Sequence, residues 1–150
     1  MNFEIEGLIR KHFRFLVDGY GFTYKDRTFS TDKLEIRIIL EREPPDTYLP
    51  GLYFKLVEEV NCPILPFDWI LYYLAGAKPY LNFYGKSLDE NMGYISDLLK
   101  KNSQKLFFDV DDWWIPAQKF RLKVWEEKYH VSPVPTFKEI YDYVKEKEGH

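Results

Sequence analysis

The hydrophobic positions of the first twenty residues recur at intervals of three and four. This spacing predicts an amphipathic helix from Ile5 to about Tyr20, with charged side chains on the opposite face. We expect the helix to end at Gly19-Tyr20-Gly21, where one glycine takes the left-handed conformation of a C-terminal cap. The predicted apolar face consists of Ile5, Leu8, Ile9, His12, Phe13, Leu16 and Tyr20.

Alternation with a period of two replaces the helical spacing in the next segment. Thr23 to Phe29 is rich in aromatic and β-branched residues, which predicts a strand, and Ser30 to Lys33 has the composition of a turn. The segments Leu34–Glu41 and Leu52–Val57 alternate in hydrophobicity, as strands with one buried face do. Short connections, including Pro44-Pro45-Asp46, predict that the strands form a three-stranded antiparallel meander.

The second half of the chain reads as helical. Asp68 to Ala75 predicts a short helix, and Ser87-Leu-Asp-Glu90 is a capping box that opens a helix to about Lys101. A second capping box, Thr136-Phe-Lys-Glu139, predicts a C-terminal helix to roughly Lys147. Residues 1–150 are therefore predicted to form a single α+β domain. An N-terminal helix precedes the meander, and several C-terminal helices pack on one face of the sheet.

The segment KLFFDVDDWWIPAQ, from Lys105 to Gln118, is harder to interpret because it contains a proline. Pro116 fits the first position of a helix, where the missing N–H is not needed, and this predicts a helix from Pro116 to about Tyr129. Ile115 precedes a proline and is biased away from helical conformation. We therefore predict that Asp109 to Ile115 is extended chain between two helices.

Charge, aromatic content and cysteine count limit the functions that this chain is expected to have. The chain contains 21 Lys and Arg residues and 24 Asp and Glu residues, a net charge of −3, which argues against general nucleic-acid binding. Aromatic residues make up 19% of the chain and favour a core built from rings. Cys62 is the only cysteine, so an intramolecular disulfide cannot form and a reducing compartment is compatible.

The chain also lacks the sequence features of secretion and membrane insertion. Its N-terminus alternates charged and apolar residues rather than presenting an apolar signal segment. The longest apolar run, Trp69 to Ala77, is shorter than the roughly 20 residues of a spanning helix. A cytoplasmic location is predicted.

Enzyme signatures are absent from the sequence. It contains no Gly-x-Ser-x-Gly, His-Glu-x-x-His, phosphate-binding loop or Cys-x-x-Cys motif, and no cofactor is predicted. His12 lies on the apolar helix face and is expected to be a hydrogen-bonded core histidine. His130 suits the carbonyl groups of a helix end. Cys62 is expected to be a small buried thiol rather than a nucleophile. The chain is accordingly predicted not to be an enzyme.

Two acidic groups are candidates for a partner-binding surface. The first, ranked higher, combines three carboxylates with two tryptophans, one or the other of which is expected to be exposed: Asp109, Asp111, Asp112, Trp113 and Trp114. Its carboxylates could also hold a hard metal ion, act as an acid/base pair, or form a solvated loop anchored to the core by one tryptophan. The second group surrounds the Pro-Pro turn and the end of the third strand: Glu41, Glu43, Asp46, Glu58 and Glu59.

One phrase of the sequence resembles a known group of proteins. FRFLVDGYGF, from Phe13 to Phe22, followed by LEIRIILERE, resembles the opening of small bacterial proteins in which such a helix leads into a charged meander. Some of those proteins resemble immunity proteins of polymorphic toxin systems, which bind a toxin domain and block it. LPFDWILYYLAG, from Leu65 to Gly76, is similar to a segment of another immunity superfamily, in which the helix precedes the sheet.

This resemblance implies a protein-binding module that neutralises a cognate toxin. Carboxylates would pair with the basic rim of the toxin's active site while an exposed aromatic side chain fills a pocket. Two alternatives stay open: a small metal-dependent hydrolase that uses Asp109, Asp111 and Asp112, and a structural subunit that associates through an aromatic surface.

Overall fold

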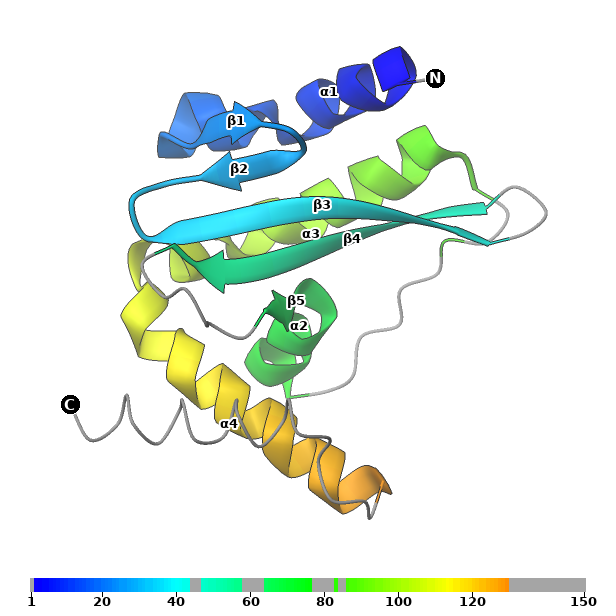
Figure 1. The fold of residues 1–150 in the computed structure, drawn as a ribbon. Helices are drawn as coiled ribbons and strands as arrows, with labels where there is room; N and C mark the ends of the chain where they lie inside the picture. The colour runs from blue at the N-terminus through cyan, green and yellow to red at the C-terminus, as the bar shows by residue number, and fades with distance from the viewer. Residues whose placement is uncertain (1, 44–46, 58–63, 77–82, 84–85, 130–150) are drawn as a thin grey trace.

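The computed structural model describes residues 2–43, 47–57, 64–76, 83 and 86–129. Within these residues, helix α1 precedes a five-stranded antiparallel sheet, and three further helices follow the last strand (Figure 1). The α+β class, with an N-terminal helix and C-terminal helices, is confirmed. The helices are α1 (Asn2–Tyr20), α2 (Phe67–Ala75), α3 (Leu88–Phe108) and α4 (Val110–Tyr129).

The sheet has more strands than the sequence predicted. Its order follows the chain, β1-β2-β3-β4-β5, and every neighbouring pair is antiparallel. The two long strands β3 and β4 form its centre, in a register that places Leu34 opposite Leu56 and Glu43 opposite Thr47. The strands are β1 (Thr23–Lys25), β2 (Thr28–Ser30), β3 (Leu34–Glu43), β4 (Thr47–Leu56) and β5 (Leu65–Pro66).

The prediction of three strands was wrong at both edges of the sheet. The segment predicted as a single strand, Thr23 to Phe29, folds as a hairpin whose turn residues Asp26 and Arg27 have φ values of 49° and 61°. Two consecutive residues with positive φ match the type I′ turn that suits the twist of a hairpin. The usual Asn-Gly or Asp-Gly signal is absent, so the turn was missed. Strand β5 is only 2 residues long and contains Pro66, so it is too short to show the alternating hydrophobic pattern of a strand.

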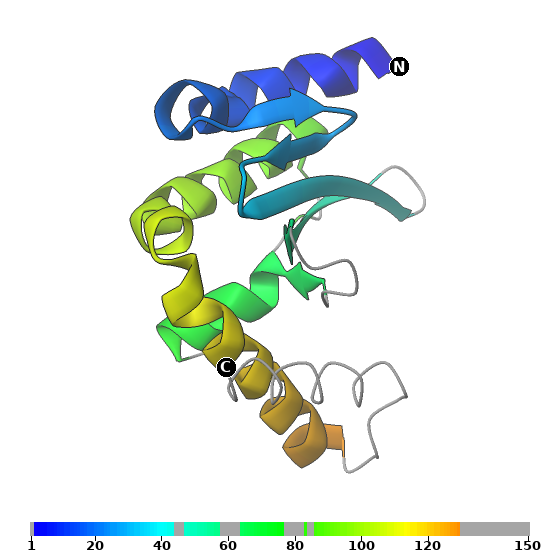
Figure 2. The same ribbon diagram turned by 60° about the vertical axis from the view of Figure 1, so that its left-hand side comes forward.

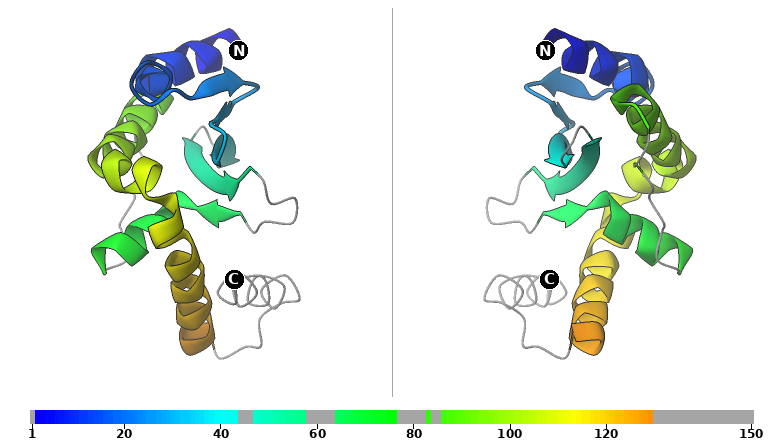
Figure 3. Two further views of the ribbon diagram at one scale, coloured as in Figure 1. Left: turned by 90° about the vertical axis from the view of Figure 1, so that its left-hand side faces the viewer. Right: turned by 90° about the vertical axis from the view of Figure 1, so that its right-hand side faces the viewer.

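One face of the sheet carries the main hydrophobic core. Side chains of β3 and β4 that point to this face are buried against α1 and α3, which lie behind the sheet (Figures 1 and 2). The views along the sheet in Figure 3 show no described helix over the opposite face of β3 and β4. The fully buried centre includes Phe13, Leu16, Ile36, Ile38, Phe54 and Leu99.

The two helix ends that the sequence predicted most specifically are confirmed. Helix α1 ends at Tyr20, and Gly21 takes the left-handed conformation with φ 73°. The Ser87 hydroxyl accepts a hydrogen bond from the Glu90 backbone N–H, and the Glu90 carboxylate accepts one from the Ser87 backbone N–H. Helix α3 continues past the predicted end at Lys101, to Phe108, because Ser103 and Leu106 continue its buried stripe.

The prediction that Asp109 to Ile115 is extended was wrong. Helix α4 begins at Val110 and contains Pro116 in its interior. Residues 110, 113, 114 and 117 are all buried, which is the spacing of one helix face, so burial of this stripe offsets the roughly 3 kcal/mol cost of an interior proline. Pro116 imposes a local cost that the sequence reveals, whereas the gain from burying this stripe arises only in the tertiary structure.

Several sequence predictions fall outside the described residues. These are the loop at Pro44 to Asp46 and the C-terminal helix from Thr136 to Lys147. The same holds for the individual candidates Glu58, Glu59, Cys62 and His130.

Candidate functional site

The first acidic group lies where α3 turns into α4. We call residues Phe108 to Asp112 the α3–α4 elbow. Asp109 ends α3 with φ −123° and ψ 47°, and its carbonyl oxygen accepts a hydrogen bond of 2.9 Å from the Asp112 backbone N–H. A single non-helical residue therefore separates two long helices. The side chains of Asp109, Asp111 and Asp112 are all exposed at this turn.

Both tryptophans of the predicted surface are buried, which corrects their assignment as an exposed anchor. Trp113 is 4% exposed and Trp114 is 1% exposed. The Trp113 ring packs edge-to-face against Phe54 at 6.2 Å, and its Nε1 donates a hydrogen bond of 3.2 Å to the Leu106 carbonyl oxygen. The helical conformation of Val110 to Ala117 explains this outcome, since it turns residues 113 and 114 together toward the core.

The exposed aromatic side chain of the elbow is Phe108, which the sequence analysis did not single out. It is 67% exposed, the largest fraction among the exposed large hydrophobic residues of the described chain. Its position two residues beyond the buried Leu106 takes it off the inner stripe of α3. The sequence would have indicated this exposure only if the predicted helix had ended at Phe108 rather than near Lys101.

A groove lies beside the exposed ring. It has a volume of about 280 Å³, and Phe108 forms part of its wall. Apolar side chains of α1, β3 and the elbow line it, while Asp32 and Lys33 contribute polar groups from the turn between β2 and β3. The elbow thus combines an apolar recess, a projecting phenyl ring and several carboxylates.

The carboxylates of the elbow also have a local structural role. Asp111 and Asp112 occupy the first turn of α4, where a negative charge interacts favourably with the helix dipole by about 0.3–1 kcal/mol. The Lys33 ammonium lies 3.8 Å from the Asp111 carboxylate, and the two side chains are 64% and 87% exposed. Such an exposed pair contributes at most about 1 kcal/mol. Both acids therefore remain accessible to a partner.

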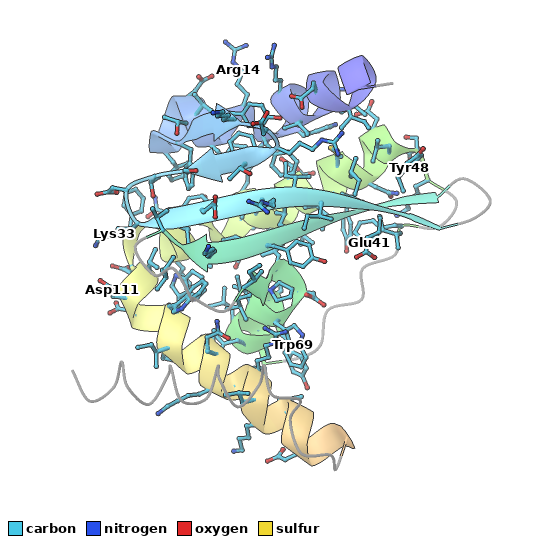
Figure 4. All side chains as sticks on the ribbon, in the orientation of Figure 1. Arg14, Lys33, Glu41, Tyr48, Trp69 and Asp111 are labelled. Carbon is cyan, nitrogen blue, oxygen red and sulfur yellow. The ribbon has the colours of Figure 1, made fainter. Side chains whose placement is uncertain are left out.

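Glu41 and Glu43, the described members of the second acidic group, lie toward the other end of the sheet. Figure 4 shows Asp111 and Lys33 near one end of the long strands and Glu41 toward the other. Seven residues of β3 lie between Lys33 and Glu41, a span of roughly 25 Å at the rise of a strand. The backbone of Glu43 pairs with Thr47. Glu41 and Glu43 therefore lie in a region separate from the elbow.

A cavity of about 170 Å³ lies beside Glu41, and it contains a tyrosine that sequence reasoning missed. Its lining includes Glu41 from β3, Tyr53 from β4 and Asp68 from the first turn of α2. Burial first, and then the negative charges of Glu41 and Asp68, raise the pKa of the Tyr53 phenol. The shift shows that both carboxylates act electrostatically on the same hydroxyl group.

The described residues contain no group of three or more His, Cys, Asp or Glu side chains arranged to hold a metal ion. Asp109, Asp111 and Asp112 lie at the elbow without converging on one point. The described residues therefore give no support to the alternative of a metal-dependent hydrolase.

A third polar cluster connects α1 to α3. The His12 Nε2 atom lies 2.5 Å from Asp89 Oδ1, and the Lys11 ammonium lies 3.0 Å from Asp89 Oδ2. The Ser96 hydroxyl donates a hydrogen bond to the His12 carbonyl oxygen. A Cβ at Gly93 would come within 3.2 Å of His12 Cε1, so the glycine allows the ring to approach α3 closely. His12 is hydrogen-bonded and mostly buried, as the sequence predicted.

This cluster makes stability depend on pH. Hydrogen bonds from His12 and Lys11 hold the pKa of the Asp89 carboxyl below its usual range. A lowered folded-state pKa stabilises the protein above the unfolded pKa of about 3.9, and this stabilisation is lost as the pH falls through the folded pKa. We therefore expect Asp89→Asn to be less stable than the wild type at pH 7 and to approach it as the pH falls through the lowered pKa of Asp89.

Urea unfolding between pH 2.5 and pH 7 measures this difference. Asp97→Asn is the matched control, because Asp97 is an exposed aspartate of the same helix. A stability difference between Asp89→Asn and wild type that is the same at every pH would contradict the prediction.

Among the described residues, no helix combines the length and apolar character needed to cross a membrane. Searches against protein-family models, curated proteins and solved structures found no match to this chain. The resemblance to immunity proteins, and the cytoplasmic location, therefore stay predictions that rest on the sequence.

Proposed function

We propose that this chain is a protein-binding module, and that its α3–α4 elbow binds a basic protein. The most specific form of this proposal is an immunity protein that occludes the active site of a cognate toxin. The observation that carries it is the exposed phenyl ring of Phe108 directly beside the exposed carboxylates of Asp109, Asp111 and Asp112.

Charge and apolar contact have different roles in this proposal. Exposed carboxylates raise the association rate of a basic partner and orient it, but they contribute little to the lifetime of the complex. A projecting aromatic ring that enters a pocket contributes binding energy at the centre of an interface. Phe108 takes the place that the sequence analysis assigned to Trp113 or Trp114, and the mechanism is otherwise unchanged.

The shape of the elbow supports the same proposal. The turn at Asp109 projects the carboxylates and the ring from the junction of two helices that are anchored in the core by Leu106 and Val110. A rigid support of this kind lowers the entropy that is lost when side chains are ordered in an interface. No comparable observation supports the metal-dependent hydrolase or the structural subunit.

The test compares three forms of the protein as bait for capture from the lysate of the source organism. They are the wild type, the Asp109/Asp111/Asp112→Asn variant and a Glu35/Asp97/Glu127→Gln/Asn/Gln variant. The second variant removes the same number of negative charges from positions outside the elbow. We expect the wild type and this control to retain one basic protein in near-equal amount, and the elbow variant to lose most of it.

Binding kinetics with the purified partner sharpen the result. We expect the elbow variant to associate about tenfold more slowly at low salt, with a difference that shrinks as salt screens the charges. Equal retention by all three baits would contradict the choice of the elbow. A partner that is acidic rather than basic would contradict the proposed chemistry.

A further inference from the structure

The cavity beside Glu41 is a second recognition feature, distinct from the elbow. We call it the Tyr53 pocket and define it by Glu41, Tyr53 and Asp68, together with the apolar side chains of Leu49, Pro50 and Phe67. Three separate elements build it, since β3, β4 and α2 contribute one polar side chain each.

The position of the Tyr53 ring is determined by the backbone beside it. A Cβ added to Gly51 would lie 2.9 Å from Tyr53 Cε2, so the ring lies against the glycine. Gly51 and Tyr53 point to the same face because they are two residues apart on one strand. The ring is therefore held as a flat wall of the pocket, and any larger residue at position 51 would displace it.

Two negative charges, those of Glu41 and Asp68, act on the pocket, and Arg121 is a cation that acts on one of them. Among the described residues, neither Glu41 nor Asp68 takes part in an ion pair within 4.0 Å. Arg121 interacts electrostatically with Asp68 and so offsets part of its charge, and its guanidinium donates a hydrogen bond of 2.9 Å to the Ile64 carbonyl oxygen. The pocket therefore presents net negative charge around an aromatic ring.

Size and donor geometry restrict the cation that such a pocket accepts. A volume of about 170 Å³ is below the roughly 300–1,000 Å³ of sites for drug-sized ligands, and it suits a single side chain. The described residues offer no three-ligand group for a metal ion. An organic cation with a short apolar stem matches both the charge and the apolar lining.

We propose that the Tyr53 pocket receives the guanidinium group of an arginine side chain from the protein partner. This inference rests on the proposed function for the identity of that partner. Arginine is favoured over lysine because its planar group can contact an aromatic ring and share hydrogen bonds between two carboxylates. The distance from the elbow, roughly 25 Å, lies within the width of about 30 Å expected for an interface of 800 Å² per partner.

The test uses a small probe rather than the partner. N-acetyl-arginine amide is titrated into the wild-type protein while NMR follows the tyrosine ring resonances, with Tyr53→Phe used to assign the Tyr53 signals. N-acetyl-citrulline amide is the neutral analogue of the same shape. We expect the arginine probe to shift the Tyr53 ring signals in a saturable manner, and the citrulline probe to leave them unchanged.

Variants on and beside the pocket complete the design. Glu41→Gln and Asp68→Asn are each expected to weaken binding of the arginine probe roughly tenfold, the effect of losing one charge-assisted contact. Glu35→Gln is the matched control. It removes a carboxylate from the same strand and the same face but does not line the pocket, and it is expected to bind the probe as the wild type does.

The outcomes separate this inference from the proposed function. Equal binding of the citrulline probe, an equal effect of Glu35→Gln, or no binding of the arginine probe would each overturn the pocket assignment. Equal binding of N-acetyl-lysine amide would overturn the choice of arginine. The Asp109/Asp111/Asp112→Asn variant should bind the probe normally, so failure of the elbow in the capture experiment leaves this measurement unaffected.

Discussion

Replacing Trp114 with alanine is expected to lower the free energy of unfolding by about 3–5 kcal/mol. The side chain is 1% exposed, and its ring contacts Trp113 at a centroid distance of 5.5 Å. Truncation removes the transfer free energy of a large ring and leaves a cavity that a packed core fills only partly. Typical domains are stable by only 5–15 kcal/mol, so this single change removes a large share of the total.

Urea unfolding of purified Trp114→Ala and wild type measures this loss directly. Lys123→Ala is a suitable control, because Lys123 is exposed on the same helix and its truncation is expected to change stability by no more than about 0.5 kcal/mol. A loss below about 1 kcal/mol in Trp114→Ala would contradict the burial of this residue. It would also revive the earlier prediction that one of the two tryptophans is available to a partner.

Phe108→Ala is expected to have the opposite profile, with a large effect on binding and a small effect on folding. The ring is 67% exposed, and its aromatic contact within the described chain is with Tyr20 at 5.9 Å. Surface substitutions of this kind usually change stability by no more than about 0.5 kcal/mol. If the ring is the central anchor of the interface, its loss costs about 2 kcal/mol or more of binding free energy, roughly a 30-fold loss of affinity.

Affinity for the captured partner, measured beside the melting temperature, tests this expectation. The loss should appear mainly in the dissociation rate, in contrast to the association-rate effect expected for the aspartate variant. Ile64→Ala is the control, since Ile64 is 50% exposed and lies outside the elbow. An affinity that changes by less than twofold in Phe108→Ala would leave the carboxylates as the only support for the elbow.

The local elements with a strong sequence signal were predicted correctly. The three- and four-residue spacing of α1 and the alternation of β3 place apolar side chains on one face whatever the rest of the chain does. The capping box at Ser87 to Glu90 acts through hydrogen bonds between residues three apart, so sequence alone identifies it. In each case the determining interaction lies within a few neighbouring residues.

The elbow shows where local reasoning fails. Pro116 and its effect on Ile115 argued for extended chain, and both effects are real local costs. The competing gain comes from burying both tryptophans, and Trp113 packs against Phe54 of β4 and donates a hydrogen bond to Leu106 of α3, so the gain depends on partners distant in the sequence. Only the tertiary structure shows that the gain exceeds the cost, and the same packing moves the exposed ring from the tryptophans to Phe108.

The sequence by itself determined the α+β class, most helices and long strands, and a set of carboxylates without enzyme motifs. The tertiary structure alone decided which of these carboxylates lie together. It separated Asp111 from Glu41 by most of the length of β3, and it joined Glu41 to Tyr53 and Asp68 from other elements. The reason is physical: exposure and proximity depend on how elements pack, and packing is set by contacts between residues that no local pattern connects.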